Sequence, residues 1–258
     1  MNIIFITSKL NFETAGASVI EHDLLIRTIK KLGHNMKVVT AYSEYNIIKH
    51  QLEYEVIEEN IKAKRQLNIQ WEIYKILKKY SNQADFFYLD GHIFLYGEGL
   101  YRKMGGKVPV AALFNRELVA WPENVSTLLG SLNDTLFKKL KKKIRWYIEK
   151  YLGMFFANSV DIFGFSNPFL EKEYINFSLK KKEKGWLIMG DQFDYHTFVH
   201  DNNIGDDFYV SKGKKQGPLV LFYSSRMAPG KGFDMLIEAF SRVKNKENYK
   251  LILGGSGP

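Results

Sequence analysis

The chain has 258 residues, of which 45% are hydrophobic and 25% charged, and this balance excludes an intrinsically disordered protein. It contains no cysteine, which excludes a disulfide scaffold, a thiolate zinc site and a cysteine nucleophile. Its 37 basic and 28 acidic residues give a net charge of +9, and this excess favours an anionic partner such as phosphate groups, nucleic acid or an acidic lipid surface.

The sequence contains no segment that is typical of export or of membrane insertion. The apolar run Ile3–Ile6 is short and no basic region precedes it, whereas a signal peptide has both a basic region and a longer apolar stretch. No uncharged apolar run approaches the roughly 20 residues that span a bilayer. We therefore expect a cytoplasmic protein.

Short apolar runs alternate with segments of helical periodicity along the chain. Strands are predicted at residues 2–7, 36–40, 54–57, 86–90, 108–114, 161–166 and 186–189. Helices are predicted between them at residues 19–32, 66–80, 95–104, 133–156 and 168–177, and Gly33 is the expected end of the first helix. This alternation predicts an α/β protein with a Rossmann-like doubly wound parallel sheet.

The composition changes near residue 200, and the alternation then begins again. We interpret residues 1–199 as one Rossmann-like domain and the polar residues 200–217 as a linker. Residues 218–258 then supply a strand, a helix and a second strand, which predict the beginning of a second Rossmann-like domain. Two strands and one helix cannot bury both faces of a sheet, so we expect this second domain to be incomplete.

One loop has a composition that is typical of anion binding. It follows the strand predicted at 219–223 and precedes a helix, where free backbone N–H groups favour a negative ligand. Ser225, Arg226 and Lys231 lie in this loop and add a hydroxyl and two positive charges, which suit a diphosphate. A nucleoside-triphosphate P-loop does not fit, because Gly232 stands where that motif needs Ser or Thr. The alternative is a turn with solvated charges.

The loop and its neighbours resemble the donor-binding half of retaining glycosyltransferases of family 4, which have the two-domain GT-B architecture. The resemblance rests on Arg226, a turn that contains Pro229, the pair Lys231-Gly232, an amphipathic helix and the closing residues 255–258. Residues 15–17, 32–40, 161–166 and 194–198 are similar to earlier family segments, in the same order. The resemblance therefore covers essentially the whole chain.

The resemblance implies transfer of a hexose from a nucleotide-diphosphate donor to a glycan or lipid-linked acceptor, as in polysaccharide biosynthesis. It implies that Arg226 and Lys231 act in catalysis, and that Gly16, Ala17 and Ser225 join them around the donor phosphates. The donor is a substrate, and no cofactor is expected. Because no Asp-x-Asp pair occurs, we expect no metal site, with cationic side chains meeting the diphosphate charge instead.

Two departures from the family pattern bear on activity. Family members usually carry a histidine after the strand at 108–114, where this sequence has Asn115 and, two residues later, Glu117. We take these two residues and His92 as candidates for contact with the acceptor. The departure keeps open an alternative, a non-catalytic nucleotide- or glycan-binding module of the same fold. The family's glutamate pair would lie beyond Pro258, so we expect the chain as given to be inactive alone.

A basic amphipathic helix is predicted within residues 133–156. An apolar row (Leu136, Leu140, Ile144, Tyr147 and Tyr151) is flanked by Lys138, Lys139, Lys141, Lys142 and Lys143. Such a helix can lie on an anionic membrane, which would make the protein peripheral at the inner membrane face. The alternative is a surface helix that packs through the apolar row. Nucleic acid is not expected, because no recognised nucleic-acid motif accompanies the charge.

Overall fold

The structure is a computed structural model of the chain, and it describes residues 1–13, 17–48, 51–63, 65–115, 136–188, 218–225, 227 and 231–255. The chain divides into two compact units, one made of residues 1–121 and 140–194 and the other of residues 122–139 and 195–258. The linker expected at 200–217 lies outside the described residues, and the predicted domain boundaries stay a prediction.

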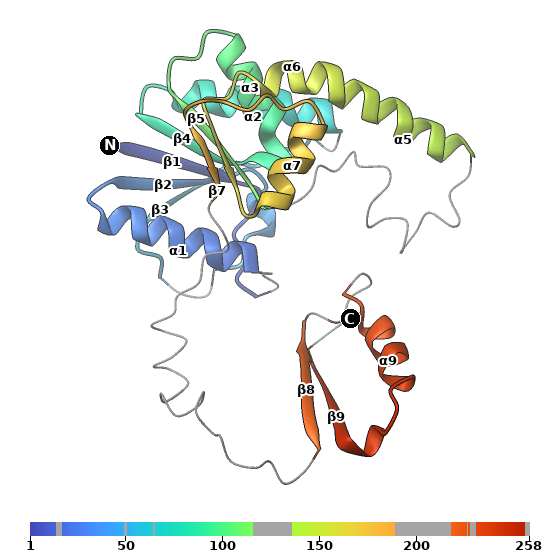
Figure 1. Ribbon diagram of the computed structural model, residues 1–258. Helices are drawn as coiled ribbons and strands as arrows, with labels where there is room; N and C mark the ends of the chain where they lie inside the picture. The colour runs from blue at the N-terminus through green and yellow to red at the C-terminus, as the bar shows by residue number, and fades with distance from the viewer. Residues whose placement is uncertain are drawn as a thin grey trace. The chain divides into compact units, whose positions relative to one another are not determined.

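The first unit is built on a seven-stranded parallel sheet (Figure 1). Its strands are β1 (Asn2–Thr7), β2 (Asn35–Thr40), β3 (Glu55–Glu58), β4 (Phe86–Asp90), β5 (Val110–Phe114), β6 (Ile162–Phe165) and β7 (Trp186–Ile188). They lie in the order β3-β2-β1-β4-β5-β6-β7, and every neighbouring pair is parallel. The chain progresses outward in one direction from β1 and in the other from β4. The α/β Rossmann-like fold class is thereby confirmed.

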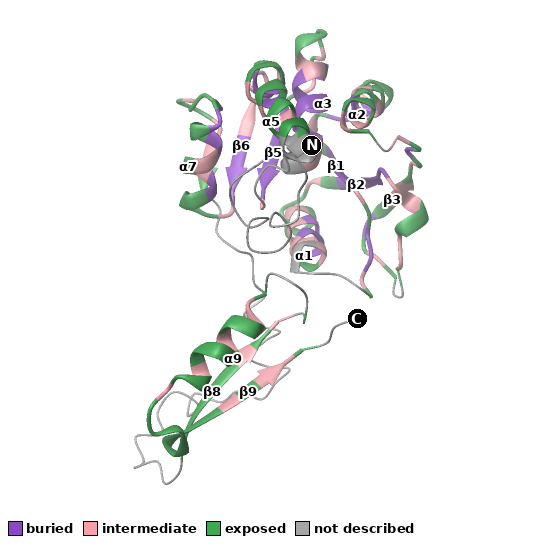
Figure 2. Cartoon of the chain, turned by 90° about the vertical axis from the view of Figure 1, so that its right-hand side faces the viewer, coloured by how far each residue is buried: buried purple, intermediate pink, exposed green. Residues whose placement is uncertain are grey.

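Helices cover both faces of this sheet (Figure 2). Helix α1 (Ala17–Lys31) packs on one face, and the other face carries α2 (Gln66–Tyr80), α3 (Gly91–Lys103), α6 (Met154–Ala157) and α7 (Pro168–Asn176). Helix α5 (Leu136–Ile148) continues through a π-helical turn at Glu149–Gly153 into α6, and a short 3₁₀ turn lies at Ser43–Tyr45. The first unit therefore has three layers, as doubly wound sheets do.

The core consists of two apolar layers, because alternate residues of a strand point to opposite faces. In β1, Ile3 and Phe5 join the layer beneath α1, whereas Ile4 and Ile6 join the larger layer on the other side. All four side chains are buried, which explains why the central strands read as continuous apolar runs rather than alternating ones.

Two predicted details were wrong. Helix α3 begins at Gly91, directly after β4, and not at residue 95. Glycine disfavours a helix locally, but a Cβ at position 91 would lie only 2.9 Å from the Ala112 Cβ, so close packing on β5 requires glycine there. In α2, the helical spacing that predicts Ile76 on the apolar side also predicts Trp71 there, yet Trp71 is half-exposed and stacks on Tyr74. The expected end of α1 at Gly33 is confirmed by its left-handed φ of 88°.

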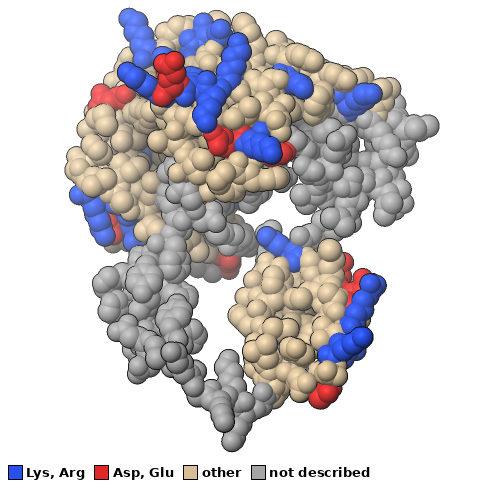
Figure 3. Space-filling model, in the orientation of Figure 1, with Lys and Arg blue, Asp and Glu red and all other residues tan. Residues whose placement is uncertain are grey.

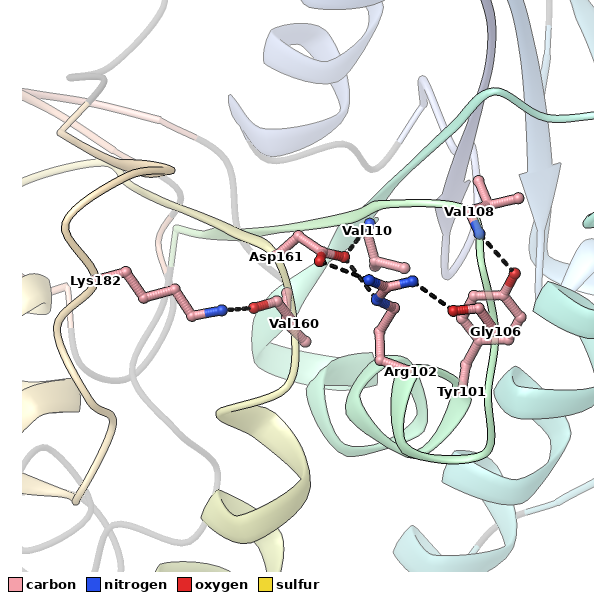
Figure 4. A network of polar contacts seen from close by, with 8 residues as sticks. All are labelled: Tyr101, Arg102, Gly106, Val108, Val110, Val160, Asp161 and Lys182. Atoms are coloured by element: carbon pink, nitrogen blue, oxygen red, sulfur yellow. Dashed lines mark hydrogen bonds and ion pairs between the residues drawn. The ribbon is translucent and has the colours of Figure 1, made fainter.

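The amino ends of β5 and β6 are joined by a polar network (Figure 4). Arg102, near the end of α3, donates from Nη2 to Asp161 Oδ1 at 2.9 Å, and its Nε lies 2.8 Å from Asp161 Oδ2. The Val110 backbone N–H donates to the same carboxylate at 2.9 Å. Paired and hydrogen-bonded in this way, the half-buried Asp161 links α3 to both strands.

The second unit has a single βαβ motif among its described residues. Strands β8 (Leu219–Ser224) and β9 (Tyr249–Gly254) are parallel, α9 (Phe233–Ser241) connects them, and a 3₁₀ turn lies at Lys246–Asn248. Its predicted strands and helix are thereby confirmed. No residue described in this unit is buried.

Candidate functional site

The first unit has its topological switch point between β1 and β4, and open parallel sheets bind ligands at the carboxyl ends of the strands beside such a point. Thr7 ends β1, Asp90 ends the neighbouring β4, and Asn115 follows the end of β5. The register of β1, β4 and β5 therefore brings three polar residues to one edge of the sheet.

A buried polar cluster of Thr7, His22 and Asp90, which we call the Asp90 group, joins α1 to this edge. The Thr7 hydroxyl donates to Asp90 Oδ2 at 2.7 Å, and His22 Nε2, from α1, lies 3.1 Å from Asp90 Oδ1. All three residues are less than 5% exposed. A buried carboxylate is costly unless it is paired, so Asp90 constrains the position of α1 relative to β1 and β4.

This group was not predicted from the sequence, although one signal was present. His22 and Asp23 interrupt the apolar periodicity of α1 and are nevertheless buried. Ile20 and Leu32, which recur with Val19, Leu24 and Ile29 at near-helical spacing and so predict an apolar face, are exposed. Helical spacing from the buried Ile26 places His22 on the face that packs against the sheet.

Glu98, in α3, is a second buried acid. It is fully buried, and neither carboxyl oxygen has a hydrogen-bond partner among the described residues. Burial, together with the nearby Asp90 charge, raises the pKa of Glu98 well above its ordinary value. Burial therefore favours the protonated, neutral form of this carboxyl group over the charged form.

The structure describes the three acceptor candidates unequally. Asn115 is half-buried, and its Oδ1 has no hydrogen-bond partner among the described residues, so it has an unused acceptor at the carboxyl edge. His92 is the second residue of α3, which places its backbone beside the end of β4, but its side chain lies outside the described residues. Glu117 also lies outside them. Their proposed roles stay predictions.

Of the donor candidates in the first unit, Gly16 lies outside the described residues, and so does the side chain of Ala17. Ala17 begins α1, the helix that follows β1. The first turn of α1 contains no acidic residue, so its N–H groups and dipole remain favourable to an anion.

In the second unit, Ser225 and Lys231 flank the loop between β8 and α9. The Tyr223 hydroxyl donates to the Lys231 carbonyl oxygen at 2.5 Å, and the Ser225 N–H donates to the Gly254 carbonyl at 3.1 Å. Both ends of the loop are thus fixed to the carboxyl edge of the small sheet, and the Lys231 side chain is exposed. Arg226 lies outside the described residues. Asp234 lies in the first turn of α9, where its negative charge opposes an anion. Binding of an anion there would therefore need the positive charges of the nearby basic side chains.

The described residues include neither a candidate metal site nor a candidate membrane span. Within those ranges, His, Asp and Glu side chains nowhere gather in a group of three or more that is able to hold a metal ion. The described helices include none that is long and apolar enough to cross a membrane.

Neither known family models nor curated proteins match this sequence. Solved structures do. The lipopolysaccharide outer core galactosyltransferase WaaB in its apo form superposes with a TM-score of 0.59 at 11% identity, covering 100% of this chain and 61% of WaaB. What is shared is the fold.

Two further solved structures show the same likeness. HepE from Anabaena, solved with UDP and glucose, has a TM-score of 0.53 at 13% identity and covers 99% of this chain and 61% of its own. The UDP-forming trehalose-phosphate synthase from Burkholderia xenovorans has a TM-score of 0.57 at 10% identity, with coverages of 98% and 64%. The chain thus spans less than two thirds of the length of these three proteins.

Proposed function

We propose that the protein is a glycosyltransferase that moves a sugar from a nucleoside-diphosphate donor to a glycan or lipid-linked acceptor. The observation that carries the proposal is the loop of the second unit, where Ser225 and Lys231 lie at the carboxyl edge of a βαβ motif, before the N-terminus of α9. The fold shared with enzymes whose names specify UDP or a transferred sugar supports it.

The proposed chemistry is departure of the diphosphate from the anomeric carbon. The bond from that carbon to the phosphate oxygen breaks, and the electron pair stays on the leaving oxygen. Lys231 and Arg226 would meet this growing negative charge, and an interaction that strengthens in the transition state lowers the barrier. We further propose that the transfer is metal-independent and retaining, as in family 4, and that it moves a hexose.

The first unit would hold the acceptor and complete the donor site. Gly16 and Ala17 precede or begin α1 and would face the diphosphate with backbone N–H groups. Asn115 would bind a sugar hydroxyl through its unused Oδ1, and His92 and Glu117 would lie nearby. The buried Asp90 group would keep α1 in place during this binding.

A lipid-linked acceptor would place the reaction at a membrane. We therefore also propose that the protein is cytoplasmic and peripheral at the inner membrane face. Its basic helix would bind acidic lipids through Lys138, Lys139, Lys141, Lys142 and Lys143. Of these lysines, the side chains of Lys141 and Lys143 are described, and both are exposed.

The decisive experiment compares Lys231→Ala and Arg226→Ala with wild type in a sugar-transfer assay on the full-length protein. Loss of one donor to transition-state charge typically lowers turnover about a hundredfold, whereas an exposed lysine changes stability by less than about 0.5 kcal/mol. Lys231→Arg should be faster than Lys231→Ala but slower than wild type, because the planar guanidinium of arginine replaces the compact ammonium of lysine. Lys78→Ala, an exposed lysine of α2, is the matched control and should keep wild-type turnover.

Wild-type turnover in both alanine variants would refute the donor-phosphate role. Tight UDP binding by a wild-type protein that transfers no sugar to any acceptor would instead favour the non-catalytic binding module.

A further inference from the structure

The segment from α5 through the π-turn into α6 carries a row of exposed apolar side chains, which we call the 140–155 stripe. Its members recur at the spacing of one helix face, and each is between 46% and 65% exposed: Leu140, Ile144, Tyr147, Ile148, Tyr151, Leu152 and Phe155. The sequence left open whether this row packs against the protein. The structure leaves it on the surface, and a contiguous exposed apolar patch marks an interaction site.

The same segment is attached to the protein by a different face. Glu149, Gly153, Met154 and Ala157 are buried, and the hydroxyl of Tyr96, in α3, donates to Glu149 Oε2 at 2.9 Å. A Cβ at Gly153 would lie 2.7 Å from the Tyr96 ring, so this contact is close. Packing of the helix therefore does not need the stripe, and a change within the stripe should leave stability nearly unchanged.

Basic side chains border the stripe. Lys141 and Lys143 are exposed on α5, and Lys103 Nζ lies 4.3 Å from the centroid of the Phe155 ring at the other end. Lys150 Nζ lies 4.7 Å from the Trp146 ring centroid. Lysine stems can lie along apolar surface while their ammonium groups reach outward. Figure 3 shows basic side chains, Lys or Arg, set among uncharged ones in this part of the molecule.

We infer that the 140–155 stripe is inserted into the surface of an anionic lipid bilayer, with the helix lying parallel to the membrane plane. Apolar side chains on one face and lysines beside them are the composition of interfacial helices, and tyrosines prefer the headgroup level. The inference deepens the proposed function, because it makes insertion of apolar side chains, rather than the lysine row alone, the basis of membrane contact.

The charge favours a bilayer over a second copy of the chain. Two copies that met through their stripes would bring the lysines that border one stripe beside the lysines that border the other, and like charges repel. An acidic lipid surface instead attracts each lysine while its acyl layer accepts the apolar row.

The test is sedimentation of the protein with vesicles, without nucleotide or acceptor, so that it is independent of transferase activity. We expect wild type to bind vesicles of phosphatidylglycerol and phosphatidylcholine at least about tenfold more tightly than vesicles of phosphatidylcholine alone. Ile144→Glu and Tyr151→Glu should each weaken binding about tenfold or more, because a charge replaces a buried apolar group. The charge reversals Lys141→Glu and Lys143→Glu, made together, should do the same.

Matched controls come from α2, where Leu67 is 71% exposed and Lys78 is also exposed. Leu67→Glu and Lys78→Glu should bind vesicles as wild type does, and all variants should melt within a few degrees of it. Wild-type binding by Ile144→Glu and Tyr151→Glu would overturn the inference. It would also be overturned if the protein binds no vesicles and forms dimers that Ile144→Glu dissociates. Either result leaves sugar transfer to a water-soluble acceptor, and hence the transferase part of the proposed function, unaffected, whereas binding to no vesicles would also remove its membrane part.

Discussion

The motifs β1–α1–β2 and β8–α9–β9 have the same local design and very different surroundings. Each pairs two six-residue strands in parallel register and connects them by one helix. Both first strands contain a phenylalanine within an apolar run, yet Phe5 is 0% exposed and Phe222 is 67% exposed. The difference lies in the neighbours, because β1 is flanked by β2 and β4 and covered on both faces.

An apolar run specifies a local strand, but it does not by itself specify that the strand is buried. Local pattern and parallel pairing suffice to specify a βαβ motif, since both motifs form. Burial depends on further strands and helices, and among the described residues β8 has a single pairing partner, β9. Because most of the free energy of folding comes from burial, the two motifs should differ strongly in stability.

Hydrogen exchange should show the largest effect. Amides of β1 and β2 should exchange only on global unfolding, whereas those of β8 and β9 should exchange at least about a thousandfold faster through local opening. The measurement is native-state exchange followed by mass spectrometry or NMR on this chain. Equal protection in the two motifs would mean that β8 and β9 are buried by contacts beyond those described.

Truncation of the two matched phenylalanines should show the next largest effect. Phe5→Ala should lower the free energy of unfolding by about 3–5 kcal/mol, because it leaves a cavity in the layer beneath α1. Phe222→Ala, at an exposed position, should change it by less than about 0.5 kcal/mol. Urea unfolding curves of the two variants test this pair, and similar losses for both would contradict the comparison.

The two units also differ in buried ionisable groups, since the first contains Glu98 and no described residue of the second is buried. The pKa of Glu98 is raised, so above its unfolded pKa of 4.5 the folded state holds more protons and stability falls as pH rises. Glu98→Gln should remove this loss. Its melting temperature should exceed that of wild type at pH 7, and the gain should vanish near pH 4.

The exposed Glu53→Gln is the control and should show no such pH-dependent gain. A constant difference between Glu98→Gln and wild type from pH 4 to pH 7 would show that Glu98 does not titrate in this way.

Much of the fold was predictable, because the elements are marked by local signals. The predictions of strands at 2–7 and 86–90 and of a helix at 66–80 agree with the structure. They succeeded because apolar periodicity is a property of one element by itself, and so is the helix end marked by Gly33. The start of α3 was not predictable, because Gly91 is favoured only by its contact with β5. In the site, Ser225 and Lys231 were recognisable as a loop motif, whereas the Asp90 group joins residues from three separate elements.

The sequence by itself determined the alternation of strands and helices, the parallel α/β class and the anion-binding composition of the loop at 225–231. These follow from the period of apolar residues and from residue chemistry, which act over a few neighbours, whereas anion binding by the loop stays a prediction. Only the tertiary structure decided that Thr7, His22 and Asp90 meet at the switch point and that the 140–155 stripe faces outward. The amphipathic pattern of a helix with two apolar faces does not specify which of them packs, because that choice depends on the shape of α3 and its Tyr96.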